Sequence, residues 1–153
     1  MITIKKGDLL EADETIIGHQ VNCCGAAGGL AAAVFKKWPE AAHDYYLVVE
    51  RIREAGGQGF VMLGKTQLCI QHGGKIIANI YGQYYAGQDY RPDVLRMALE
   101  SLAVKAKAMK ASVALPWRLS CGICGGDWDE VLPMIEETMR DVNCTIYRRD
   151  QDE

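Results

Sequence analysis

Segments typical of β-strands alternate with segments typical of α-helices along most of this chain, and few folds accommodate that order. Met1–Lys5 and Thr15–Asn22 are short and rich in β-branched residues, which favours strands. Leu30–Trp38 favours a helix that should end near Pro39, because the residue before a proline disfavours the helical conformation. An apolar stripe at helical spacing then predicts a second helix, which ends at Gly56-Gly57.

The second half of the chain adds a hairpin and two further helices. Thr66–Gln71 and Lys75–Tyr81 flank His72-Gly73-Gly74, and two short strands around a Gly-Gly turn predict a hairpin. Apolar residues at helical spacing predict one helix after Pro92 and another after Asp127. Two more strands are expected, Ser112–Pro116 and Cys144–Arg148.

Together these segments predict an α/β fold, a three-layer α/β/α sandwich with a mixed central sheet. The chain has 153 residues, of which 49% are hydrophobic and 24% charged, and this suits a single domain over residues 1–153. No apolar run approaches the roughly 18 residues needed to cross a bilayer, and the first residues lack the apolar core of a signal peptide. We therefore expect a cytoplasmic protein without a membrane partner.

The charge distribution argues against binding to duplex nucleic acid. The formal net charge is −3, and the basic residues form only short pairs such as Lys36-Lys37 and Arg148-Arg149. Duplex binding depends on neutralising many phosphates, so this balance disfavours it, whereas a small anion held by backbone amides remains compatible. Six cysteines in a cytoplasmic chain are expected to be reduced thiols rather than a disulfide framework.

Two segments share one layout, in which a buried strand leads through a loop of small residues into a helix. They are Val21–Val34 and Leu115–Trp128. Such a loop presents free amides and the positive end of the helix dipole, which suits phosphate. Neither segment has the spacing of a dinucleotide-binding G-x-G-x-x-G motif or of a P-loop, so ATP hydrolysis is disfavoured.

Three motifs, in order along the chain, resemble those of the macro domain family, whose members bind ADP-ribose. KKGDLLEA is similar to the family's Gly-Asp motif after the first strand, and VNCCGAAGGLA to its Asn- and Gly-rich first loop. SCGICGGDW is similar to its Ser-x-Gly-Ile-x-Gly diphosphate loop. The resemblance runs over nearly the whole chain, and it implies that the ligand is ADP-ribose or a derivative, free or attached to a protein.

The resemblance assigns roles to individual residues. It implies that Asp8 accepts a hydrogen bond from the adenine amino group near the Leu9 backbone, and that Tyr147 stacks on adenine. Asn22 and the amides around Gly28, Gly29 and Leu30 in the first loop would contact the distal ribose. The five amides of Cys121 to Gly125 in the second loop would wrap the diphosphate. The residues expected to bind the ligand in these two loops, and at Gln83 after the hairpin, are Asn22, Gly28, Gly29, Leu30, Gln83, Ser120, Cys121, Gly122, Ile123, Cys124 and Gly125.

Within the family, the chain looks most like the branch that removes phosphate from ADP-ribose 1″-phosphate, because His19 precedes an Asn-Cys-x-Gly loop. A histidine there could act as general acid or base while water attacks the 1″-phosphorus, since its pKa lies near working pH. Loop amides would stabilise the phosphoryl charge, without a metal ion or another cofactor. The alternative interpretation of His19 is an ordinary strand histidine.

The related branch that cleaves ADP-ribose from protein glutamates uses a lysine and an aspartate at positions that correspond here to Gln83 and Cys124. A glutamine cannot form a lysine-type covalent adduct, and a cysteine replaces the carboxylate poorly, so that mechanism is disfavoured. Cys124 also stands where other branches carry an aromatic residue, which implies a more open pocket. Two acidic residues near the site have structural interpretations: Asp127 as a helix cap with Glu130, and Asp89 as a solvated loop residue.

Three alternatives remain open. Cys23, Cys24, Cys121 and Cys124 could together bind structural zinc if the two loops met. The Cys121-x-x-Cys124 motif could be redox-active, although Gly125-Gly126 separates it from the helix that such a motif normally opens. Lastly, the function could differ: the domain could bind free or protein-linked ADP-ribose without catalysis, or hydrolyse another ester of ADP-ribose.

Overall fold

The computed structural model describes residues 2–57 and 59–149. Six strands form one sheet in the order β1-β6-β5-β2-β4-β3. The strands are β1 (Ile2–Lys6), β2 (Ile16–Val21), β3 (Thr66–Ile70), β4 (Ile76–Tyr81), β5 (Val113–Pro116) and β6 (Cys144–Arg148).

All neighbouring strands are parallel except β3, which pairs antiparallel with β4. The register of this pair runs from Thr66 opposite Ile80 to Ile70 opposite Ile76, which confirms the predicted hairpin. The five parallel strands are β1, β2, β4, β5 and β6, and their carboxyl ends therefore lie at the same edge of the sheet.

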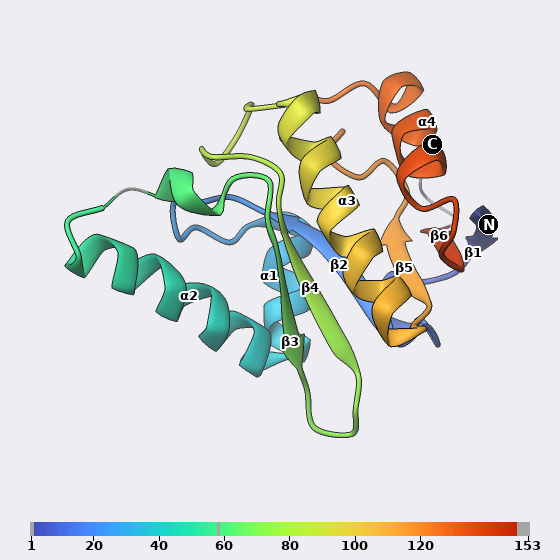
Figure 1. Ribbon diagram of the computed structural model, residues 1–153, viewed down its shortest axis with the longest axis horizontal. Helices are drawn as coiled ribbons and strands as arrows, with labels where there is room; N and C mark the ends of the chain where they lie inside the picture. The colour runs from blue at the N-terminus through green and yellow to red at the C-terminus, as the bar shows by residue number, and fades with distance from the viewer. Residues whose placement is uncertain (1, 58, 150–153) are drawn as a thin grey trace.

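Helices cover both faces of the sheet, with α1 and α2 on one side and α3 and α4 on the other (Figure 1). The helices are α1 (Gly29–Lys37), α2 (Pro39–Glu54), α3 (Pro92–Met109) and α4 (Trp128–Thr138), and two short 3₁₀ helices are η1 (Leu9–Glu11) and η2 (Gly59–Met62). The predicted three-layer sandwich with a mixed sheet is thus confirmed.

The chain forms a buried core on each face of the sheet. Side chains alternate along a strand, so on β2 Ile16 packs toward α3 and α4, while Ile17 and Val21 pack toward α1 and α2. Leu95, Leu99 and Leu102 are the fully buried leucines of the α3 stripe predicted from the sequence. β2 is buried on both faces because it is one of the two middle strands of the sheet and helices cover both sides.

Local sequence explains where the helices begin and end. Trp38 ends α1 and Pro39 begins α2, because proline needs no amide partner in the first turn of a helix. Gly56, with a φ of 76°, follows α2 as predicted. Lys110 takes the left-handed conformation at the end of α3, where glycine is more usual.

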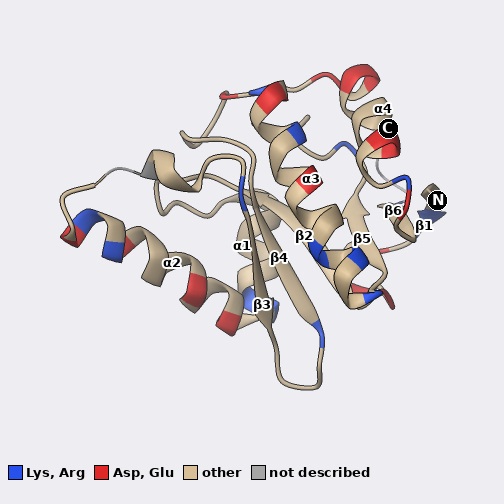
Figure 2. Cartoon of the chain, in the orientation of Figure 1, with Lys and Arg blue, Asp and Glu red and all other residues tan. Residues whose placement is uncertain are grey.

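Basic residues (blue) and acidic residues (red) both occur along α2 and α3 (Figure 2). This mixture of signs agrees with the small formal net charge of −3. Of the helices in the described part of the chain, none combines the length and apolarity that a bilayer crossing requires.

The core of the α3 face gives a test of the packing. Leu102→Ala should lower the free energy of unfolding by about 3 kcal/mol, because it leaves a cavity in a fully buried site. Val104→Ala on the same helix removes a side chain that is 69% exposed and should change it by less than about 0.5 kcal/mol. Urea denaturation of both variants measures the difference, and equal losses would contradict this account of the core.

Candidate functional site

A cleft of about 560 Å³ opens at the edge where the parallel strands end. Segments that follow or end β1, β2, β4, β5 and β6 all contribute to it, as expected for the carboxyl edge of a parallel sheet. Its volume lies within the range of small-molecule sites. The lining residues are Asp8, Leu9, Leu10, Gln20, Gly28, Gly29, Leu30, Ala31, Ala33, Gln83, Pro116, Trp117, Arg118, Leu119, Ser120, Gly122, Ile123, Cys124, Tyr147 and Arg149.

A second hollow of about 330 Å³ continues the cleft past Gln83 and Cys124. The two cavities share six lining residues, namely Gln20, Gly28, Ala31, Gln83, Ile123 and Cys124. Beyond these, the second hollow is lined by Val21, Asn22, Ala26, Ala27, Ala86 and Gly87. We call it the distal hollow, and the rest of the cleft the main cleft.

The first loop, between β2 and α1, is organised by Asn22 and Tyr45. Asn22 Oδ1 accepts a hydrogen bond from Cys24 N at 2.9 Å, and its Nδ2 donates to Ala26 O at 2.6 Å. The Tyr45 hydroxyl lies 2.9 Å from both oxygens of Asn22 and accepts a hydrogen bond from Gly25 N. Asn22, which was expected to contact the ligand, lines the distal hollow, but its side-chain amide is hydrogen-bonded within the loop.

The start of α1 leaves backbone donors facing the main cleft. Gly28 is the N-cap and supplies no side-chain hydrogen bond. The amides of Gly29, Leu30 and Ala31 in the first turn have no partner within the helix, since the residues four positions earlier are not helical. Gly28 and these three residues line the main cleft, while the ribose contact expected of Gly28, Gly29 and Leu30 stays a prediction.

The second loop, between β5 and α4, leaves a shorter set of amides than expected. Cys121 N donates to Arg118 O at 2.9 Å, and Gly125 N donates to Gly122 O at 3.1 Å. These two amides are used inside the loop, and neither residue lines the cleft. The amides of Gly122, Ile123 and Cys124 make no hydrogen bond with a described residue, so three donors replace the expected five.

Tight packing holds the second loop in this shape. Gly126 N donates to Ser120 O at 2.9 Å, and a Cβ at Gly126 would lie 2.6 Å from that same oxygen. Only glycine fits there. Asp127 caps α4 as predicted by accepting from Asp129 N at 2.9 Å, whereas Glu130 accepts a hydrogen bond from Tyr90 instead of closing a capping box.

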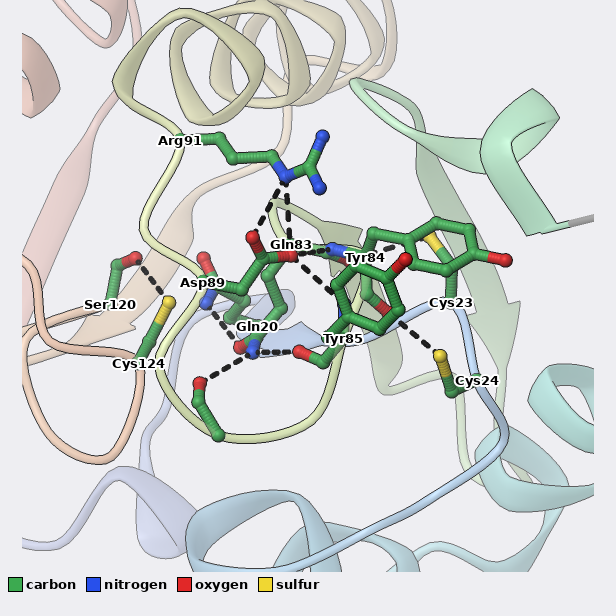
Figure 3. A network of polar contacts seen from close by, with 11 residues as sticks. Gln20, Cys23, Cys24, Gln83, Tyr84, Tyr85, Asp89, Arg91, Ser120 and Cys124 are labelled. Atoms are coloured by element: carbon green, nitrogen blue, oxygen red, sulfur yellow. Dashed lines mark hydrogen bonds and ion pairs between the residues drawn. The ribbon is translucent and has the colours of Figure 1, made fainter.

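The loop after β4 is built around a carboxylate (Figure 3). Asp89 Oδ2 accepts hydrogen bonds from the backbone of Tyr84 and Tyr85, at 2.8 and 2.9 Å, and Arg91 Nε donates to both oxygens. Partial burial pushes the pKa of Asp89 upward, but these donors outweigh it and keep the pKa below its usual value. The expectation of a solvated Asp89 was therefore wrong, because its side chain orders the loop.

Gln83 reaches the cleft from the same loop. It accepts a hydrogen bond from Gln20 Nε2 at 2.6 Å and donates to Tyr85 O and Gly87 O (Figure 3). The expected ligand position thus carries a fixed, uncharged amide, which lines both the main cleft and the distal hollow. Ser120, also expected at the site, donates to the Cys124 sulfur at 3.6 Å.

Asp8, Leu9 and Tyr147 lie at the end of the main cleft away from the distal hollow. Asp8 Oδ1 accepts from Leu10 N at 2.9 Å, and its other oxygen has no partner among the described residues. Tyr147 is only 6% exposed, and its hydroxyl donates to Glu14 at 2.6 Å. It is therefore a fixed wall of the cleft, with little of its ring free to stack.

His19 does not lie where a catalytic role requires it. It is fully buried, packs edge-on against Phe35 at 5.2 Å, and lines neither cavity. Its Nε2 lies 2.7 Å from Asn79 Oδ1, and burial lowers its pKa to about 4, although the bond to Asn79 opposes the shift. His19 therefore lies in the core, because odd-numbered residues of β2 face α1, and the expected general acid or base at this position stays a prediction.

The cysteines do not form a metal site in this structure. Cys23 and Cys24 donate through sulfur to Gln83 O and Tyr84 O, and Cys121 donates to Leu119 O. Within residues 2–57 and 59–149, no group of three or more His, Cys, Asp or Glu side chains is placed to hold a metal ion. Burial raises the pKa of Cys23 to about 12 and of Cys121 to about 11, which disfavours redox reactivity at either thiol.

Several residues that line the main cleft were not expected from the sequence, and four of them carry large polar or aromatic side chains: Gln20, Trp117, Arg118 and Arg149. Each lies next to the last residue of a parallel strand or within two residues after it. The rule that ligands bind at the carboxyl ends of parallel strands predicts such positions. The glycine motifs do not, because these four side chains belong to no motif.

No family model matches this chain, and no curated protein sequence does either. Solved structures do match. A macrodomain protein from Streptomyces coelicolor is 29% identical over 97% of this chain and 99% of that chain, with a TM-score of 0.78. The macrodomain of Mycobacterium tuberculosis DarG is 28% identical over 96% and 97%, with a TM-score of 0.80.

A third structure, Thermosipho africanus DarTG in complex with ADP-ribose, is 16% identical and matches 99% of this chain with 42% of its own, at a TM-score of 0.78. At that identity the likeness concerns the fold alone. The three comparisons agree that the chain has the macrodomain fold.

The Tyr45 hydroxyl should be essential to the first loop. Tyr45→Phe should lower the free energy of unfolding by about 1 to 2 kcal/mol, since Gly25 N loses its acceptor and Asn22 a donor. Tyr46→Phe is the matched control, because Tyr46 is on the same helix and 39% exposed. Denaturation curves for the two variants test this, and equal stability would remove Tyr45 from the account of the loop.

The burial of neutral His19 should make stability depend on pH. The unfolded chain binds a proton at His19 below its ordinary pKa of 6.5, while the folded chain does so only near 4, so stability falls as pH drops between these values. The loss attributable to His19 is about 3 kcal/mol. His19→Gln, which retains an amide donor for Asn79, should show a smaller fall between pH 7 and 4. Parallel curves for variant and wild type would contradict the assigned state.

Proposed function

We propose that this chain binds ADP-ribose, free or attached to another molecule, in the main cleft and distal hollow. One observation carries the proposal: two separate sets of amides, without a hydrogen-bond partner among the described residues, belong to residues that line one cleft. Gly29–Ala31 at the start of α1 and Gly122–Cys124 in the second loop together offer six backbone donors. No lysine is among the described residues that line the cleft. Converging backbone amides and a helix dipole suit a diphosphate.

The two ends of the cleft differ in the way that an ADP-ribose molecule does. Asp8 keeps one carboxylate oxygen available to accept a hydrogen bond from an adenine amino group, beside the wall formed by Tyr147. Half of the residues that line the distal hollow are alanine or glycine, which leave room for a ribose. The macrodomain fold of the chain and the ADP-ribose complex of the Thermosipho protein also support ADP-ribose as the ligand.

Binding without hydrolysis is the better supported form of this function. Cleavage of ADP-ribose 1″-phosphate needs a group that transfers protons near the distal ribose. Among the described residues that line the distal hollow there is no carboxylate, histidine or lysine, and His19 is fully buried and does not line it. Hydrolysis of the 1″-phosphate, expected from the resemblance, remains the alternative for experiment.

A charge placed at the start of α1 tests the amide site directly. Gly28→Asp should cap α1 and keep or raise stability, because Gly28 has an extended backbone and a Cβ there meets nothing within 4 Å. The added carboxylate would occupy the helix amides and repel a diphosphate, so ADP-ribose affinity should fall at least about tenfold. Gly28→Ala adds a Cβ without charge and is the matched control.

Calorimetric titration of wild type with ADP-ribose provides the baseline, and absence of binding would refute the proposal. Thermal melts establish that both Gly28 variants are folded. Equal affinity in Gly28→Asp and Gly28→Ala would mean that the α1 amides are not the phosphate site. Incubation with ADP-ribose 1″-phosphate, followed by a phosphate assay, separates binding from hydrolysis: release by wild type would establish the alternative, and release by His19→Gln would assign it to other residues.

A further inference from the structure

The main cleft carries positive charge at the end away from the distal hollow. Arg118 and Arg149 line the main cleft together with Trp117 and Tyr147, and none of these four residues lines the distal hollow. Asp8 is the only carboxylate among the described residues that line the main cleft, and one of its oxygens caps η1. Two of the described residues that line the main cleft are thus cationic and one is anionic, whereas the whole chain has a formal net charge of −3.

The side chain of Arg118 makes no contact that would explain a role in stabilising the fold. The side chain is exposed and makes no hydrogen bond or ion pair with a described residue. Trp117 beside it already has a cationic partner, since the Arg148 guanidinium lies 4.5 Å from its ring centre. Arg118 is thus a cation at the cleft wall with no ion-pair partner among residues 2–57 and 59–149.

The backbone at Arg118 is held in a costly conformation. Its φ of 62° lies in the left-handed region, which costs a residue other than glycine about 1 kcal/mol or more. Two hydrogen bonds maintain it, Cys121 N to Arg118 O at 2.9 Å and Leu119 N to Pro116 O at 3.2 Å. Backbone conformations of this kind concentrate at ligand sites, where they position a group for binding.

We propose that Arg118, with Arg149, forms a subsite for an additional phosphate on the adenosine ribose, so that the preferred ligand is ADP-ribose 2′-phosphate. The inference rests on the proposed function, which places adenosine at the end of the cleft that Asp8 and Tyr147 line. A guanidinium matches the geometry of phosphate with two parallel hydrogen bonds. In dinucleotide sites, a carboxylate serves the 2′-hydroxyl and an arginine serves the 2′-phosphate.

The test compares two ligands on the full chain by calorimetry at low salt. Wild type should bind ADP-ribose 2′-phosphate about tenfold more tightly than ADP-ribose, as expected for charged hydrogen bonds to one phosphate. That ratio should shrink as salt rises, because the subsite is open to solvent. Arg118→Gln should bring the ratio close to one, and Lys105→Gln, which removes a positive charge from the exposed side of α3, should leave it unchanged.

Arg118→Gly guards against a folding artefact. Glycine adopts a φ of 62° without strain, so this variant should melt no lower than wild type and still lose the preference for the 2′-phosphate. Equal affinity of wild type for the two ligands would overturn the subsite while leaving ADP-ribose binding intact. A loss of affinity for both ligands by one factor in Arg118→Gln would also overturn it, because Arg118 would then bind the diphosphate. Failure of both ligands to bind would refute the proposed function itself.

Discussion

The parallel alignment of five strands is the constraint on which the rest of this structure depends. Because β1, β2, β4, β5 and β6 run in one direction, the loops that follow them meet at one edge of the sheet, although they come from distant parts of the chain. The antiparallel β3 contributes only to the far edge and brings no loop to the cleft. The site is therefore a consequence of topology before any side chain is considered.

Each loop at that edge is then fixed by its own internal hydrogen bonds. Asn22 with Tyr45 orders the first loop, Asp89 orders the loop after β4, and backbone bonds across Gly126 order the second loop. The side chains that order these loops are hydrogen-bonded within them and are not free to bind a ligand. At the start of α1 and in the second loop the available donors are therefore backbone amides, whereas Asp8, Arg118 and Tyr147 bring side chains to the main cleft.

Much of the fold and part of the site could be predicted from the sequence. Periodicity located the helices and strands, and the glycine loops indicated which strands end at the cleft. The states of His19 and Asp89 could not be predicted, because they depend on contacts made by residues far along the chain: Asn79 and Phe35 bury His19, while Arg91 and two backbone amides hold Asp89. Likewise, only the folded loop shows that Cys121 N and Gly125 N are already used. A motif names the residues of a loop, but not the direction in which each group points.

The six amides at the cleft have a consequence for how this protein tolerates change. An amide is present whatever the residue, so most substitutions at Leu30, Ile123 or Cys124 alter the shape of the wall without removing a donor. Substitutions should instead be harmful at positions that fix the backbone conformation of the loops. At Gly126, for example, an added methyl group would collide with the Ser120 carbonyl oxygen. A random mutational scan should therefore find a permissive rim around the cleft and a few intolerant points behind it, so that sequences can drift widely here while the same ligand contacts persist.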